Sequence, residues 1–252
     1  MRRFLTPVLW VEEVRPGMFL LWAERPDIAL EPGQFFMVGC GEGVFLRRPL
    51  SVHRIAPSRL AFLFQVLGRG TAWLSRRKPG EALDLLGPLG RGFRLDSVTN
   101  KLLLVAGGMG VAPLAFLAQR AAEKGLEATL LLGARTKDRL YPLELLPRGL
   151  KTVIATEDGS FGQRGLATSL LPQLLAEADQ VFACGPVEML RALARMPQLK
   201  DKPVQVSLEL RLGCGFGVCL GCSVPTRNGN RLVCRDGPVL SLDEVRWEGV
   251  EL

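Results

Sequence analysis

Four of the chain's six cysteines lie within one glycine-rich stretch of twenty-one residues. They are Cys214, Cys219, Cys222 and Cys234, and their spacing is C-x4-C-x2-C-x11-C. A C-x4-C-x2-C run with a fourth cysteine further on is the spacing of plant-type [2Fe–2S] sites. The interleaved glycines let the backbone adopt positive φ, so that its amide groups can point at the sulfurs. The stretch therefore predicts a [2Fe–2S] cluster.

Two other uses of these cysteines stay open on spacing alone. A structural zinc site usually shows two C-x2-C pairs, whereas only one pair here is that close. Redox-active disulfides are the second alternative. Asn228-Gly229 is a strong signal for a hairpin turn, which would return Cys234 to the loop. Because the last gap is much shorter than in a plant ferredoxin, we expect a small cluster-binding appendage rather than a ferredoxin domain.

The chain is long enough for two ordinary domains, or for two and a small module. The 252 residues are 48% apolar and 23% charged, which is enough for packed cores. The net charge of +7 is spread along the chain without a basic arm or interleaved aromatic residues, so nucleic-acid binding is not expected. The apolar run at the start of the sequence is too short for a signal peptide. We expect a cytoplasmic protein whose clustered cysteines bind metal.

Residues 1–97 show short β segments separated by proline and glycine, which predict a small antiparallel barrel. The expected strands are residues 8–14, 18–23, 34–38, 50–55, 60–66 and 82–86, with one short helix after Thr71. From residue 98 the pattern changes to apolar strands that alternate with helical stretches, which predicts a doubly wound parallel sheet over 98–205. Residues 206–252 would form the cluster module.

The longest uncharged run, residues 102–118, approaches the length of a membrane span. Its middle holds Gly107, Gly108 and Gly110, which favour a strand, a glycine turn and a helix, so no membrane span is expected. Such a turn places a dinucleotide's pyrophosphate at a helix N-terminus. The second strand ends in Arg135 rather than an acidic residue, and Glu157 ends the third. An arginine favours NADP and a carboxylate favours NAD, so the choice of nucleotide stays open.

Other motifs are weak when each is taken alone. Arg48-Pro49-Leu50-Ser51 and Gly68-Arg69-Gly70-Thr71 can bind phosphate or simply begin a strand and a helix. Cys184-Gly185-Pro186 ends a strand at the edge where ligands bind, although a buried cysteine is also a common core residue. Cys40 and the single histidine, His53, have no partner in the pattern, and we expect neither to be catalytic.

The order of these motifs resembles the ferredoxin–NADP reductase superfamily. With the C-terminal cysteines added, the whole chain resembles the electron-transfer subunits of class 1B dihydroorotate dehydrogenase, the PyrK-type family. That resemblance implies three cofactors, FAD, a [2Fe–2S] cluster and NAD, and no catalytic side chain. It implies that FAD is bound by Arg48, Pro49, Leu50, Ser51, Leu63, Phe64, Gln65, Gly70 and Thr71. It assigns NAD to Gly107, Gly108, Gly110, Cys184, Gly185 and Pro186, and the cluster to the four cysteines.

The same resemblance implies a partner, an FMN-containing catalytic subunit, in a heterotetramer of two plus two. Electrons would pass from the partner's FMN through the cluster and FAD to NAD⁺ in pyrimidine biosynthesis. Two alternatives stay open. One is the small subunit of an NADH-dependent ferredoxin:NADP oxidoreductase or of a sulfhydrogenase. The other is a zinc-stapled nucleotide-binding regulatory protein with no redox role.

Overall fold

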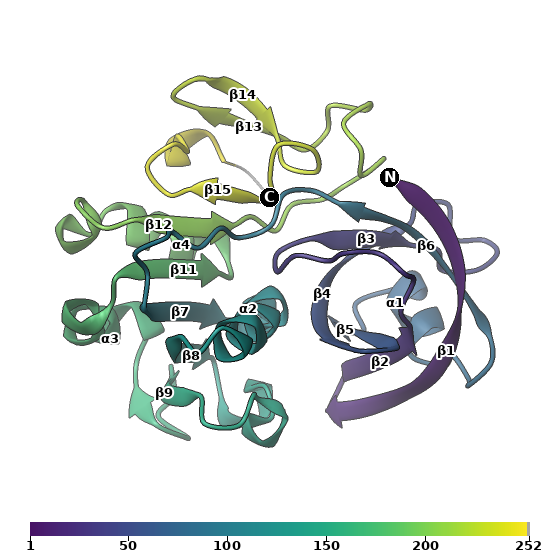
Figure 1. Cartoon of the computed structure of the whole chain (residues 1–252), viewed down its shortest axis with the longest axis horizontal. Helices are drawn as coiled ribbons and strands as arrows, with labels where there is room; N and C mark the ends of the chain where they lie inside the picture. Colours follow the sequence, from purple (N-terminus) through teal and green to yellow (C-terminus); the bar gives the residue numbers. More distant parts are fainter. Residues whose placement is uncertain (251–252) are drawn as a thin grey trace.

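The N-terminal part of the chain is a closed antiparallel barrel of six strands in the order β1-β2-β5-β4-β3-β6 (Figure 1). The computed structural model describes residues 1–250. The barrel strands are β1 (Arg2–Arg15), β2 (Met18–Glu24), β3 (Phe35–Val38), β4 (Arg48–Ala56), β5 (Arg59–Gln65) and β6 (Ala82–Leu89). One short helix, α1 (Arg69–Leu74), follows β5. The predicted barrel is confirmed, because each apolar segment pairs with two neighbours and leaves no open edge.

The second part is a seven-stranded sheet in the order β10-β9-β8-β7-β11-β12-β15. Its strands are β7 (Lys101–Gly107), β8 (Glu127–Ala134), β9 (Lys151–Thr156), β10 (Gln163–Arg164), β11 (Gln180–Cys184), β12 (Val204–Ser207) and β15 (Val239–Ser241). The helices are α2 (Val111–Glu123), α3 (Ala167–Leu174) and α4 (Val187–Ala194). All the strand pairs are parallel except β12 with β15.

Alternate residues of β7 enter two different cores, because successive side chains of a strand point to opposite faces. Leu102 and Leu104 pack with α2, whereas Leu103 and Val105 pack with α3 and α4. Helices therefore cover both faces of the sheet, and the predicted doubly wound architecture is confirmed. In the part of the chain that the structure describes, no helix has the length and apolar character needed to cross a membrane.

The cysteine-rich segment lies above both larger parts (Figure 1). The predicted hairpin joins β13 (Ser223–Thr226) to β14 (Gly229–Leu232). Its two turn residues are Arg227 and Asn228, one position before the expected Asn228-Gly229 turn, because Gly229 already pairs with Thr226. The chain then adds β15 to the sheet as an antiparallel edge strand beside β12. Sequence patterns predicted no strand at residues 239–241, because three residues carry too little periodicity. β15 links the cysteine-rich segment to the sheet through backbone hydrogen bonds.

Candidate functional site

The four clustered cysteines form two pairs of thiols. The Cys222 and Cys234 sulfurs are 3.2 Å apart and both residues are buried. Cys214 and Cys219 make the second pair, in which Cys219 is exposed and its backbone amide lies beside the Cys214 sulfur. The hairpin β13–β14 brings Cys234 back to Cys222, as the Asn-Gly turn predicts. One pair thus lies inside the protein and the other at its surface.

The backbone around Cys214 supplies hydrogen-bond donors to its sulfur. The amides of Val218 and Cys219 lie 3.3 and 3.5 Å from Cys214 Sγ. Burial opposes ionisation of the Cys214 thiol, but backbone hydrogen bonds from Cys219, Phe216 and Val218 lower its pKa to about 6. Gly215 and Gly217 have φ of 84° and 89°, which bends the chain around the sulfur. The loop therefore stabilises a thiolate, which is the form that binds metal.

This arrangement fits a two-iron cluster better than one tetrahedral zinc ion. A single zinc ion needs all four ligands around one centre. Within residues 1–250, no three His, Cys, Asp or Glu side chains converge closely enough to hold one ion. Two pairs of thiols suit a cluster in which each iron takes two protein sulfurs. The donor set of Cys214, Cys219, Cys222 and Cys234 therefore fits a [2Fe–2S] group.

The segment expected to bind FAD, Arg48–Ser51, lies at the start of β4. The guanidinium of Arg48 lies across Gly70, where a Cβ would stand 2.9 Å from Arg48 Nε. Arg48 Nη1 also donates to the Leu46 carbonyl at 2.6 Å. Because Gly70 has no side chain, the arginine can lie directly against the first turn of α1. The structure thus brings together two parts of the predicted FAD-binding set, namely Arg48–Ser51, which we call the FAD segment, and Gly70-Thr71.

Other members of the predicted FAD set have partners within the protein. Leu63 and Phe64 are each 3% exposed, so their side chains are packed in the core. Leu50 is also buried. The Thr71 hydroxyl accepts hydrogen bonds from the amides of Leu67 and Gly68 and so caps α1. A role in FAD binding for these four residues stays a prediction.

A cavity of about 860 Å³ lies at the carboxyl ends of the parallel strands. It is bounded by both larger parts of the protein. The barrel contributes Met18 and Gln65, and the sheet contributes Gly107, Gly108, Met109, Gly133, Ala134, Arg135, Thr136, Arg139, Glu157, Gly165, Leu166, Ala167, Thr168, Pro186, Glu188, Met189 and Ala192. We call this space the nucleotide cavity. The carboxyl edge of a parallel sheet is the usual place for ligands in such folds.

The glycine turn at the edge of the nucleotide cavity is closely packed against the end of β11 and against Met189 of α4. A Cβ on Gly110 would lie 1.9 Å from the Cys184 carbonyl oxygen, and one on Gly107 would lie 2.8 Å from Met189 Sδ. These contacts seat the start of α2 directly against the end of β11. Of the predicted NAD residues, Gly107, Gly108 and Pro186 line the cavity, whereas Gly110, Cys184 and Gly185 do not.

Cys184 is 1% exposed, and its thiol lies 3.4 Å from Glu209 Oε1. Burial, together with the charge of Glu209, raises the pKa of the Cys184 thiol. Glu209 is exposed as a whole residue, but desolvation of its carboxyl group raises its pKa. Sequence reasoning missed Glu209, because a single carboxylate after β12 belongs to none of the motifs.

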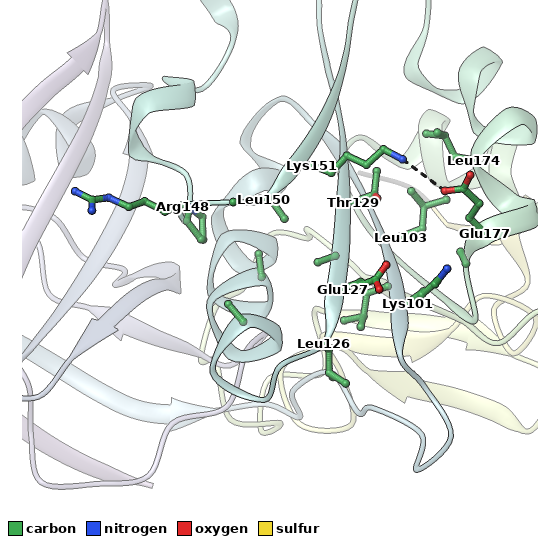
Figure 2. Close-up of a pocket in the computed structure, with 17 residues that line it drawn as sticks. Lys101, Leu103, Leu126, Glu127, Thr129, Arg148, Leu150, Lys151, Leu174 and Glu177 are labelled. Atoms are coloured by element: carbon green, nitrogen blue, oxygen red, sulfur yellow. Dashed lines mark hydrogen bonds and ion pairs between the residues drawn. The ribbon is translucent and has the colours of Figure 1, made fainter.

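A second cavity, of about 370 Å³, lies at the opposite, amino-terminal ends of the strands (Figure 2). Figure 2 shows Lys151 joined to Glu177 and Arg148 pointing away from the other side chains. The Lys151–Glu177 ion pair spans 3.5 Å. Gly149 lines this space, but it lies in the turn that leads into β9 rather than at the N-terminus of a helix. The second cavity therefore lacks the phosphate-binding element that the nucleotide cavity has.

The cluster loop and the FAD segment are joined through Met37 of β3. Gly215 lies so close to Met37 that an added Cβ would stand 2.4 Å from Met37 Cγ. On the barrel, Met37 pairs with Pro49 of the FAD segment. Arg47 holds this region by donating to the Met37 carbonyl and to Asp84, whose carboxylate also binds Arg3. Neither Met37 nor Asp84 carried a sequence signal, because both contacts depend on the folded barrel.

Comparison with known proteins relates the chain to one family. Residues 209–246 match the family model described as the iron-sulfur cluster binding domain of dihydroorotate dehydrogenase B. The chain is 40% identical to the dihydroorotate dehydrogenase B (NAD⁺) electron transfer subunit of Desulforamulus reducens, over 97% of this chain and 98% of that one. It is 39% identical to the protein of the same name from Bacillus cereus strain B4264, over 85% and 86% of the two chains.

Solved structures show the same fold. A chain from the structure of an NADH-dependent reduced ferredoxin-NADP oxidoreductase, studied for flavin-based electron bifurcation, superposes with a TM-score of 0.86. It is 30% identical, and the match covers 97% of this chain and 91% of that one. A ferredoxin NADP⁺ reductase from Neisseria gonorrhoeae with bound FAD and NADP gives a TM-score of 0.63 at 21% identity, over 76% and 89% of the two chains. The latter shows similarity of fold alone.

Proposed function

Because the chain belongs to the family of dihydroorotate dehydrogenase B electron transfer subunits, we propose that it relays electrons between a catalytic partner and NAD⁺. The relay uses a [2Fe–2S] cluster and FAD. The partner holds FMN and oxidises dihydroorotate to orotate in pyrimidine biosynthesis. The proposed complex is a cytoplasmic heterotetramer of two copies of each subunit.

The observation that carries this proposal is the contiguity of the three sites. The cluster loop contacts Met37, which pairs with Pro49 of the FAD segment. Gln65, at the end of the strand that neighbours β4, lines the nucleotide cavity together with Gly107 and Gly108. The residues proposed for the cluster, FAD and the nucleotide therefore lie on neighbouring elements, from the cluster loop through β3, β4 and β5 to the nucleotide cavity.

Each part of the chain has a defined task in this proposal. Arg48 and Gly70 hold the phosphates of FAD, and the turn at Gly107–Gly110 receives the pyrophosphate of NAD. The four cysteines hold the cluster. The bound cofactors supply hydride transfer and single-electron transfer, and the protein supplies position and electrostatic environment. The corresponding units are proposed as residues 1–97, 98–205 and 206–252.

We assign the partner's docking surface to the exposed end of the cluster loop. Phe216, Val218 and Leu220 are 39%, 72% and 62% exposed, so three apolar side chains meet solvent within five residues. Leu220 also has a φ of 59°, a left-handed conformation that costs about 1 to 2 kcal/mol in a non-glycine residue. Exposed apolar side chains on a strained loop are typical of a contact surface. This surface adjoins the exposed pair Cys214–Cys219, where electrons would enter.

A second function, the small subunit of an NADH-dependent ferredoxin:NADP oxidoreductase, is favoured only by the solved structure with a TM-score of 0.86. That chain is 30% identical, whereas the Desulforamulus reducens dihydroorotate dehydrogenase subunit is 40% identical over nearly the full length of both chains. The relatives therefore favour the first proposal. Identification of the partner distinguishes the two.

Anaerobic purification of the protein from its native cells tests the proposal directly. We expect an FMN-containing subunit to co-elute and the complex to reduce NAD⁺ when dihydroorotate is added. Val218→Asp should weaken co-elution at least about tenfold, because an unpaired charge would be buried in the interface. Val98→Asp is the matched control, since Val98 is 80% exposed and lies in the segment between barrel and sheet. Co-elution of a ferredoxin-linked flavoprotein instead would contradict the assignment of pathway and partner.

A further inference from the structure

His53, the only histidine of the chain, is the extra residue of a β-bulge in β4. Val52 pairs with Phe62 of β5, whereas Arg54 pairs with Ala61, so His53 has no partner opposite it. Such a bulge interrupts strand pairing and redirects a side chain. Here it directs a histidine toward the sheet rather than continuing the pairing with β5. The residue lies two positions after Ser51, the last residue of the FAD segment.

The imidazole of His53 is fully buried and bonded on both sides. Nδ1 lies 2.9 Å from the Ala112 carbonyl oxygen, and Nε2 lies 2.8 Å from the hydroxyl of Tyr141. A carbonyl can only accept, so Nδ1 carries the proton and donates it to Ala112. Nε2 therefore accepts from the Tyr141 hydroxyl. Tyr141 is the chain's only tyrosine and is 1% exposed.

The bond to Ala112 reaches the first turn of α2, two residues after the last glycine of the dinucleotide turn. A second attachment lies further along the same helix. Gln119 donates to the Ile55 carbonyl at 2.8 Å and accepts from the Ile55 amide at 3.2 Å. Two attachment points on one helix fix its direction relative to β4, which a single point would not. The helix that begins at the nucleotide turn is thereby held on the strand that begins with the FAD segment.

We propose that His53 is a positioning residue that sets the distance between the FAD segment and the nucleotide turn through its bond to Ala112. The inference rests on the proposed function, because it concerns the hydride transfer between NADH and FAD. His53 does not line the nucleotide cavity, and the hydrogen bonds of its ring go to Ala112 and Tyr141. Its effect is exerted through the placement of α2 on the barrel.

The proposal predicts that the rate of hydride transfer and the stability of the fold respond to different bonds of His53. A histidine with only a structural role would not show this difference. Hydride transfer is steep in distance, and a misplacement of about 1 Å can cost roughly a hundredfold in rate. Loss of the Tyr141 bond should lower stability without moving α2. Loss of the Ala112 bond should slow hydride transfer. Rate and stability should therefore not follow each other across a set of variants.

Three variants of the cofactor-loaded full chain test this proposal: His53→Phe, His53→Asn and Tyr141→Phe. The amide nitrogen of asparagine stands close to the place of Nδ1 and can still donate to Ala112, whereas phenylalanine cannot. Anaerobic stopped-flow measurement of flavin bleaching by NADH should show a loss of about tenfold to a hundredfold for His53→Phe. The rate of His53→Asn and of Tyr141→Phe should stay within about threefold of wild type, although both variants melt at a lower temperature.

Hydrogen–deuterium exchange of the peptides covering residues 48–56 and 107–119 gives a readout independent of activity. Exchange should be faster in His53→Phe than in His53→Asn. The proposal is overturned if His53→Phe transfers hydride at the wild-type rate, or if the rates of all three variants follow their melting temperatures. If wild-type protein binds no FAD, the proposed function fails, and the exchange comparison alone decides whether His53 fixes α2 on β4.

Discussion

At the scale of single residues, the molecule relies on groups held in one protonation state. Burial lowers the pKa of His53 to about 3, while the bond to Ala112 opposes this shift and the charge of Arg54 adds to it. The pKa of Tyr141 is raised, chiefly by burial. Both side chains therefore stay neutral over the physiological range, and their hydrogen bonds keep one direction.

The single histidine gives a direct test of this state. Its ring-proton NMR signal should not titrate between about pH 8 and about pH 5, whereas an unperturbed histidine has a midpoint near about 6.5. The unfolded chain binds a proton below that value and the folded chain does not. Stability linked to His53 is thus present above about pH 6.5 and falls as the pH drops toward 3, by about 2 kcal/mol between about pH 7 and about pH 5. A titration midpoint near neutrality would show that the ring is not buried and bonded as described.

At the scale of elements, the turn between β7 and α2 depends on the absence of a side chain. A Cβ on Gly110 would overlap the carbonyl group of Cys184. The atoms that it would meet belong to the backbone, so they cannot move aside as a flexible side chain could. Gly110→Ala should therefore push α2 away from β11, lower the melting temperature and weaken NADH binding by at least about tenfold. Gly125, at the other end of α2, has φ of 70° and no atom near its Cβ position.

Gly125→Ala is the matched control at the opposite end of that helix. It should lower the free energy of unfolding by about 1 kcal/mol, because alanine disfavours the left-handed conformation, and it should leave the dissociation constant for NADH unchanged. Thermal melting and a fluorescence titration with NADH measure both effects. Equal losses of NADH binding in the two variants would show that the contact between Gly110 and Cys184 does not position the turn.

Patterns within single elements predicted the barrel, the parallel sheet and the hairpin, because each depends on local periodicity or turn chemistry. The hairpin is the clearest case, since Asn228-Gly229 predicts a turn there, although the turn itself is formed by Arg227 and Asn228. Contacts between elements carried no such signal. Met37, Glu209 and Tyr141 meet their partners only after the barrel, the sheet and the cysteine-rich segment have come together. The edge strand β15 was missed for a different reason, since its three residues carry too little periodicity.

At the scale of the whole molecule, the proposed electron relay runs through all three parts of the chain. The surface pair Cys214–Cys219 lies at one end, Met37 and the FAD segment lie in the middle, and the nucleotide cavity lies at the other end. The exposed apolar side chains of the cluster loop place the proposed partner contact beside the surface pair. The interdomain bonds of His53 and Gln119 join the middle of the path to its nucleotide end.

An anaerobic titration of the purified protein with NADH tests this path most directly, followed by optical absorption and electron paramagnetic resonance. We predict about one FAD and about two irons per chain, bleaching of the flavin band, and then the signal of a reduced [2Fe–2S] cluster at low temperature. Cys222→Ser should abolish the cluster signal and leave the flavin bleaching in place. A colourless protein that contains zinc, or a flavin that NADH reduces without any cluster signal, would contradict the account.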